Sequence, residues 1–188
     1  MRPYPLASAE LVDDVLATWD RVTETVKARF GGLSADALGW QPGPRAWGVG
    51  HCLVHLARTN ELYRGALTPA LRPRAPSEDG PLRGRWFGRL FTRMVGPGGI
   101  KVKSPEILRP RQRIVDASSL ETFLAEQHRC RGLFDEGRGL DLDNLRVLSP
   151  VASWVKLTAG DAFRVMVAHE ERHLAQAVRV ASNPDFPG

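Results

Sequence analysis

The chain has 188 residues, of which 43% are apolar and 25% are charged, a composition that excludes a disordered chain and predicts a single globular domain over residues 1–188. A net charge of +5 falls short of a strong nucleic-acid signal. No basic start leads into an apolar run, and no eighteen consecutive residues are apolar, so we expect a cytoplasmic protein. Two cysteines are too few for a disulfide framework and are expected to be free thiols.

Four segments have apolar residues at helical spacing, and none has a convincing strand alternation. The first opens at Ser8, a candidate helix cap, and repeats apolar residues along one face as far as Phe30. The second begins near Trp47 and is apolar on two neighbouring faces, one of which carries Cys52 and His55. This second helix is therefore expected to be buried on two sides.

The third and fourth segments have clear helix-start signals. The third begins at Ser118 and continues to Phe134, and the fourth begins at the capping pair Thr158 and Asp161 and continues to Val180. We therefore predict four long helices.

Residues 72–117, dense in proline, glycine and arginine, connect the second helix to the third. Antiparallel neighbours need only a few linking residues, whereas a parallel pair requires a crossover that travels the length of both helices. The sequence therefore predicts an all-α four-helix bundle with a long crossover between helices two and three.

Basic charge is concentrated in residues 64–113, which carry +9 while the remainder of the chain carries −4. Such a patch can hold phosphate or carboxylate groups, and the interleaved stretch 83–94 also has the composition of a nucleic-acid or membrane-surface segment. The simpler interpretation is a solvated face, so we expect no membrane partner and no nucleic-acid partner. The basic residues are Arg64, Arg72, Arg74, Arg83, Arg85, Arg89, Arg93, Lys101, Lys103, Arg109, Arg111 and Arg113.

Residues 169–173 read HEERH and match H-E-x-x-H, the helical signature of zinc peptidases. Helix positions four apart lie one above the other, so His169 and His173 can point at a common ion, and both lie on an apolar stripe. Burying two imidazoles costs free energy unless each finds a partner, and a metal satisfies both. The alternative is two histidines hydrogen-bonded to separate groups.

The sequence argues against a peptidase. A third ligand is expected on a later helix, but only fifteen residues follow His173, and the metzincin extension would need glycine and histidine where this chain has Gln176 and Arg179. Glu170 lies about 100° around the helix from His169, so we interpret it as a solvated helix residue, with contact to the ligands as the alternative.

The third ligand is then expected upstream. The second helix carries His51 and His55, and the third carries only His128, off the main apolar face. His55 lies deeper along the bundle, so His51 is interpreted as an outer contact or a surface residue. Cys52 is a weaker candidate that we interpret as a small buried residue. The predicted metal ligands are His55, His169 and His173.

The motifs WGVGHCLVHLARTNELY and VAHEERHLAQ resemble those of the DinB-like (DinB/YfiT) metalloenzyme family. That family has a tryptophan, a histidine eight residues later followed by leucine, and a final H-x-x-x-H with a trailing glutamine. The similarity covers nearly the whole chain in helix order, although only these two motifs are specific. It implies an up-down-down-up bundle, one divalent metal on three histidines and frequently a homodimer. The matching residues are Trp47, His55, Leu56, His169, His173 and Gln176.

Some relatives in this family are thiol S-transferases or isomerases that use bacillithiol, mycothiol or glutathione. Three neutral histidines with an open position match a catalytic site, with zinc or nickel foremost, although iron and manganese also accept imidazole. We therefore predict a metal-dependent transferase that activates a low-molecular-weight thiol for attack on a small-molecule substrate. Residues His51, Glu170 and Gln176 are expected beside the ligands, and no catalytic or substrate-binding residue is predicted.

Two other function classes remain open. One is a metal-dependent hydrolase, in which the activated species is water and no thiol is needed. The other is a non-catalytic helical bundle that binds an anionic partner through the basic crossover.

Overall fold

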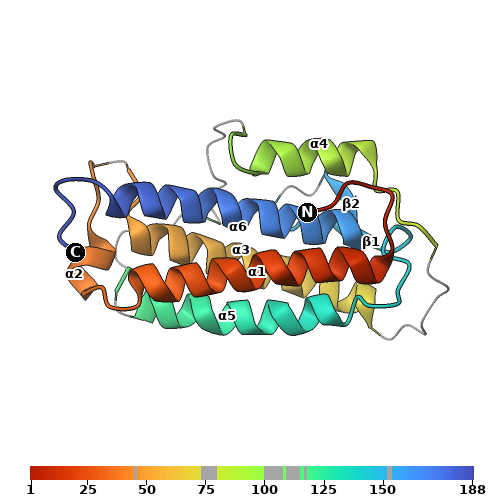
Figure 1. Ribbon diagram of the computed structural model, residues 1–188, viewed down its shortest axis with the longest axis horizontal. Coiled ribbons are helices and arrows are strands. Elements are labelled where there is room, and N and C mark those ends of the chain that lie inside the picture. The colour runs from red at the N-terminus through yellow and green to blue at the C-terminus, as the bar shows by residue number, and fades with distance from the viewer. Residues whose placement is uncertain (45, 73–79, 100–107, 109–114, 117, 152–153) are drawn as a thin grey trace.

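The computed structural model describes residues 1–188 except 45, 73–79, 100–107, 109–114, 117 and 152–153. Four long helices dominate it and lie side by side (Figure 1), which confirms the predicted all-α class. Their bounds match the four predicted segments closely. They are α1 (Ser8–Phe30), α3 (Val49–Leu71), α5 (Ser118–Asp135) and α6 (Ala159–Ala181).

The long helices bury their apolar stripes against one another. Helices α1 and α3 each pack on both α5 and α6. Trp19 of α1 contacts the edge of Phe134 at 4.8 Å between ring centroids, and Phe134 contacts Phe163 of α6 at 4.9 Å. All three side chains are almost fully buried, and edge-to-face aromatic contacts add to the stabilisation from burial. This aromatic core holds α1, α5 and α6 against one another.

Shorter elements occupy the connections. Helix α2 (Ala35–Gly39) precedes α3, and helix α4 (Trp86–Val95) lies within the predicted crossover and on the outer side of α6 (Figure 1). Strands β1 (Arg146–Leu148) and β2 (Lys156–Thr158) form an antiparallel pair. The sequence shows no convincing alternation for either strand, because three residues are too few to produce one.

The predicted N-cap is confirmed at α6 but not at α1. The Thr158 hydroxyl oxygen accepts a hydrogen bond from the Asp161 backbone N–H at 3.0 Å, which confirms this cap. Ser8, however, is the first residue of α1 and follows the N-cap Ala7. Its hydroxyl donates to the Gly137 carbonyl oxygen at 3.0 Å, so the prediction of a Ser8 cap is wrong and the side chain instead ties α1 to the loop after α5.

The basic residues of 64–113 are distributed unevenly. Arg64 of α3 forms an ion pair with Glu126 of α5, and Arg72, directly after α3, forms one with Glu136, directly after α5. Four exposed arginines lie on or just before α4. The other six basic residues lie outside the described residues, as does most of the connection that follows α4. The exposed four are Arg83, Arg85, Arg89 and Arg93.

Both cysteines are buried free thiols, as predicted. Burial raises the pKa of Cys52 to about 12 and raises that of Cys130 further, so both thiols stay protonated at neutral pH. No helix among the described residues is long and apolar enough to cross a membrane.

Candidate metal centre

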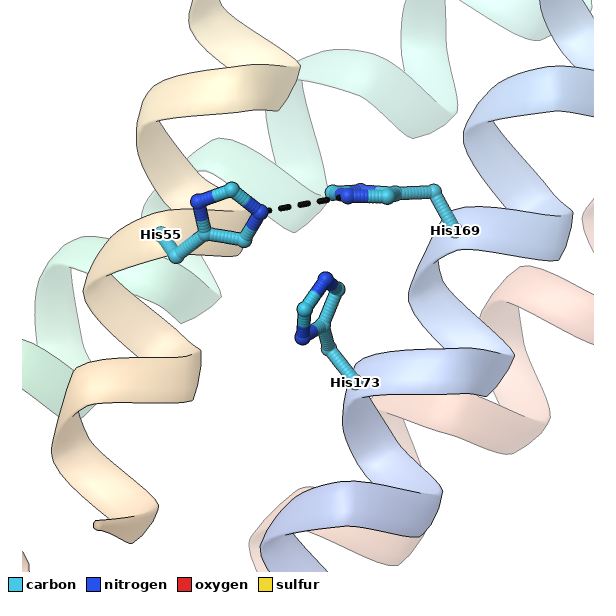
Figure 2. Close-up of side chains that lie close together, drawn as sticks. All are labelled: His55, His169 and His173. Carbon is cyan, nitrogen blue, oxygen red and sulfur yellow. Dashed lines mark hydrogen bonds between the residues drawn. The ribbon is translucent and has the colours of Figure 1, made fainter. Parts of the chain in front are cut away.

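Three histidines from two helices converge inside the protein. His55 comes from α3, and His169 and His173 come from successive turns of α6 (Figure 2). One ring nitrogen of each lies within 4.8 Å of the corresponding nitrogens of the other two. The Nε2 atoms of His55 and His169 are 3.1 Å apart. The three residues selected from the sequence are thus brought together by the packing of α3 on α6.

Trp47 lies against this cluster, which we name the histidine triad. Its ring centroid lies 4.8 Å from that of His55 and 5.6 Å from that of His173, nearly parallel to the latter. The adjacent Gly48 lies so close to the Trp40 backbone that a Cβ there would be 1.9 Å from the Trp40 carbonyl oxygen, so only glycine fits at this position. The indole therefore covers part of the triad and limits how its rings can turn.

Two hydrogen bonds determine which ring nitrogen of His55 and which of His173 can bind a metal. His55 Nδ1 lies 2.9 Å from the Leu108 carbonyl oxygen, and His173 Nδ1 lies 3.1 Å from Gln176 Oε1. Because both oxygens only accept, both Nδ1 atoms donate, and a neutral ring then has its lone pair at Nε2. Gln176 therefore contacts a triad residue, as expected for a residue beside the ligands.

Burial keeps the triad neutral. Burial is the main cause that lowers the pKa of His55, and it lowers that of His173 to about 3. The pKa of His169 is lowered well below its usual range, first by burial and then by the charges of the other two histidines and Arg172. Although His169 keeps some exposed surface, its Nδ1 is shielded from solvent. Neutral imidazoles are the form that binds metals.

The donor set fits a divalent cation. Two imidazole nitrogens bound at about 2.0–2.1 Å in tetrahedral geometry would be separated by about 3.3–3.4 Å. The observed 3.1 Å between Nε2 of His55 and Nε2 of His169 is close to that value. Because His55 Nε2 carries a lone pair, His169 Nε2 donates its N–H proton to that atom in the metal-free protein. A bound cation would take the place of this proton. The triad is therefore compatible with a divalent metal.

Glu170 contradicts the interpretation of a solvated residue. Its side chain is fully buried, and its Oε1 accepts hydrogen bonds from Asn60 Nδ2 at 2.6 Å and Gln127 Nε2 at 2.9 Å. Burial raises its pKa to about 8 despite these two hydrogen bonds. It hydrogen-bonds none of the triad histidines. The glutamate of H-E-x-x-H is thus engaged in the protein interior and does not occupy the position of a peptidase base.

The remaining sequence candidates lie apart from the triad. His51 is buried at the start of α3, where its Nδ1 accepts a hydrogen bond from the Gly48 N–H at 3.3 Å. Cys52 is buried in the core beside α1 and α5 residues, and His128 is exposed on α5. None of these three belongs to the triad.

Sequence reasoning missed the polar network around Glu170. Asn60 and Gln127 both lie at interior positions of otherwise apolar stripes on α3 and α5, and Glu170 lies in line with Phe163 and Val167 on a second buried face of α6. Polar residues at interior positions of three helices indicate a buried network, because each would otherwise lack a hydrogen-bond partner. That signal was present in the sequence.

Together, the helical fold and the histidine triad define a helical protein with a candidate metal site. A model of the DinB superfamily matches residues 18–177, more than four-fifths of the chain. The chain therefore belongs to the DinB superfamily, which is metal-binding, and the resemblance seen in the two motifs is confirmed. No curated protein and no solved structure matches the chain.

Proposed function

We propose that this protein is a metal-dependent enzyme that transfers a small-molecule thiol to an electrophilic substrate. In this proposal one divalent ion, zinc or nickel, is bound by His55, His169 and His173. The observation that carries it is that three neutral imidazoles, without any carboxylate, make up the cluster found among the described residues. A dication bound by neutral ligands keeps its full charge and lowers the pKa of a water or thiol that joins it.

The position of Glu170 favours a thiol over water. Hydrolases with the H-E-x-x-H motif use this glutamate as a general base, but here its carboxyl group is held by Asn60 and Gln127. Within the described part of the chain, no carboxylate hydrogen-bonds a triad histidine. A thiol has an ordinary pKa of about 8.5 and loses its proton without a strong base, so thiol transfer suits this site better than hydrolysis.

The positive charge of Arg172 favours an anionic thiol at this site. Arg172 directly precedes His173, and its charge contributes to the lowered pKa of His169 and His173. Its Nη1 donates to the Met94 carbonyl oxygen at 3.1 Å, which anchors the guanidinium group between α6 and α4. Of crossover residues 100–114, the structure describes only Leu108.

The test is incubation of tag-free protein with glutathione or bacillithiol and a haloalkane. During transfer the thiol loses its proton, its sulfur bonds to the electrophilic carbon, and the carbon–halogen bond breaks with release of halide. We expect a thioether product that disappears after chelation and returns when zinc or nickel is added. Mass spectrometry of the product measures it directly.

Two variants make the test specific. His173→Ala removes a proposed ligand and is expected to reduce the rate to background, whereas His128→Ala changes an exposed histidine of α5 and is expected to keep it. No metal-dependent product with either thiol would contradict the proposal. Chelator-sensitive hydrolysis without thiol would favour the hydrolase instead, and salt-sensitive anion binding unaffected by His169→Ala would favour a non-catalytic bundle.

The finer architecture belongs to the same proposal. We propose an up-down-down-up four-helix bundle that acts as a homodimer in the cytoplasm, as the family resemblance implies. The colour gradients along α1, α3, α5 and α6 in Figure 1 support this order of helix directions. Light scattering of the purified protein would test the dimer.

A further inference from the structure

Helix α4 has an outer face that the fold does not use. The helix packs on α6 and β2, with Gly88 buried against Asp161 and with Phe87 and Phe91 packed against the core. At 100° per residue, the side chains of Trp86, Arg89, Leu90 and Arg93 fall within an arc of about 100° on the opposite side. All four are exposed, so α4 is amphipathic in an uncommon sense: its outer face carries both apolar and basic residues.

The outer face continues onto Trp154. The Trp154 ring lies 6.3 Å from Phe87 between centroids and is 75% exposed, and Trp86 is 71% exposed. Leu90 is 46% exposed and lies on the same face of α4 as Trp86. We name Trp86, Arg89, Leu90, Arg93 and Trp154 the α4 patch. Two exposed tryptophans in one patch indicate a surface that is covered during function, because each leaves a large apolar area in water.

The charge of the α4 patch is positive. No acidic residue occurs in α4, and Arg83 and Arg85 extend the basic sequence before the helix. Within the described part of the chain, none of these arginines forms an ion pair, in contrast to Arg64 and Arg72. The guanidinium groups of the patch are therefore available to an anionic partner.

We propose that the α4 patch binds the surface of an anionic phospholipid bilayer. Tryptophan side chains favour the boundary between headgroups and acyl chains, and leucine at the centre of a helix face adds apolar area that enters the same layer. Arginine at the rim contacts lipid phosphates, and each basic residue near an anionic surface contributes about fivefold in affinity. The patch combines these three requirements on one outer helix, in contrast to the sequence-based expectation of no membrane partner.

A second copy of the chain fits this surface less well. In a two-fold symmetric contact the patch would face itself, so arginines would lie opposite arginines, and like charges in an interface oppose association. Nucleic acid also fits less well, because phosphates and sugars offer no apolar layer for Leu90. Both alternatives are distinguishable outcomes of the experiment.

The experiment is co-sedimentation of the full chain with vesicles of phosphatidylcholine alone or with an equal amount of phosphatidylglycerol. We expect binding to the mixed vesicles at least about tenfold tighter than to neutral ones, weakened by added salt. Arg89→Glu/Arg93→Glu is expected to lower the affinity by more than about 25-fold, since two cationic contacts are lost and reversed. Trp86→Ala/Trp154→Ala is expected to abolish the blue shift of tryptophan fluorescence on vesicle addition.

The matched control is Arg131→Glu/Arg138→Glu, on α5 and on the turn directly after it, and α5 lies on the other side of the bundle from α4 (Figure 1). It changes the net charge by the same amount and breaks only exposed ion pairs, so its vesicle affinity is expected to stay within about threefold of that of the native chain. Thermal melts check that each variant is folded.

The proposal is overturned if the chain ignores anionic vesicles at low salt, or if both double-glutamate variants lose binding equally. It is also overturned if the α4 variant converts a dimer to a monomer without affecting vesicle binding, or if it affects binding to duplex DNA alone.

Discussion

Two sides of α6 carry adjacent residues of one short motif and serve different purposes. On one side, His169 and His173 form the histidine triad with His55. On the other side, Glu170 forms a hydrogen-bond network with Asn60 and Gln127. Burial lowers the pKa of the histidines and raises that of the glutamate, so both groups are neutral near pH 7. A neutral imidazole keeps a lone pair for a cation, but a protonated carboxyl group is a poor ligand. The same physical cause therefore prepares one side to bind metal and makes the other structural.

The largest expected effect comes from removing one triad member. His173→Ala leaves two ligands, and we expect metal affinity to fall by more than about 100-fold, since even residues that only orient ligands change affinity by 10–100-fold. Competition titration with a chromophoric chelator measures this affinity. His128→Ala is the matched control, because this histidine is exposed on α5, and it should leave the affinity unchanged. Equal affinities for both variants would show that the metal binds elsewhere.

The glutamate side is expected to respond to pH. The pKa of Glu170 is raised to about 8 in the folded protein from an ordinary value of 4.5, so its stabilising effect is complete below 4.5 and is lost as pH rises toward 8. In Glu170→Gln this dependence disappears. The free energy of unfolding of Glu170→Gln should therefore rise relative to that of the native protein as the pH increases. The expected rise is up to about 1.4 kcal/mol for each pH unit between 4.5 and about 8.

Urea unfolding at a series of pH values measures this shift. Glu171→Gln is the matched control, because Glu171 is the next residue and forms only an exposed ion pair with Arg21. It should change stability by less than about 1 kcal/mol. Metal content should survive in both variants. Loss of metal from Glu170→Gln would contradict the separation of the two sides of α6.

A smaller effect is expected from the contact that orients His173. Gln176→Leu removes the oxygen that accepts the Nδ1 proton, so the ring loses its preferred orientation while all three ligands remain. We expect metal affinity to fall about tenfold, as measured by the same chelator competition. An unchanged affinity would mean that packing against Trp47 alone orients the ring.

Much of the fold was predictable from sequence because the long helices have regular apolar stripes and clear ends. The bounds of α1 and α6 agree with the predicted segments to within a few residues. Helix α4 was missed because its arginines drew attention to charge, although Phe87, Phe91 and Val95 recur every four residues. The two short strands carry too few residues for any pattern.

The site was predictable where side chains alone decide it. His55, His169 and His173 share stripes on two helices, so their meeting requires only that α3 and α6 are neighbours. The prediction for Glu170 was wrong because α6 is buried on two faces. Only the face that carries the histidines was recognised as buried in the sequence, so the other face was taken to be solvated. The Leu108 carbonyl oxygen that orients His55 is a backbone group from a distant segment, and no residue type signals it.

The most direct test of the account is the anomalous scattering of crystals grown from tag-free protein supplied with zinc or nickel. The account predicts a single metal peak within about 2.0–2.1 Å of a ring nitrogen from each of His55, His169 and His173. A peak bound elsewhere, or triad rings that stay hydrogen-bonded to one another with no metal among them, would contradict it.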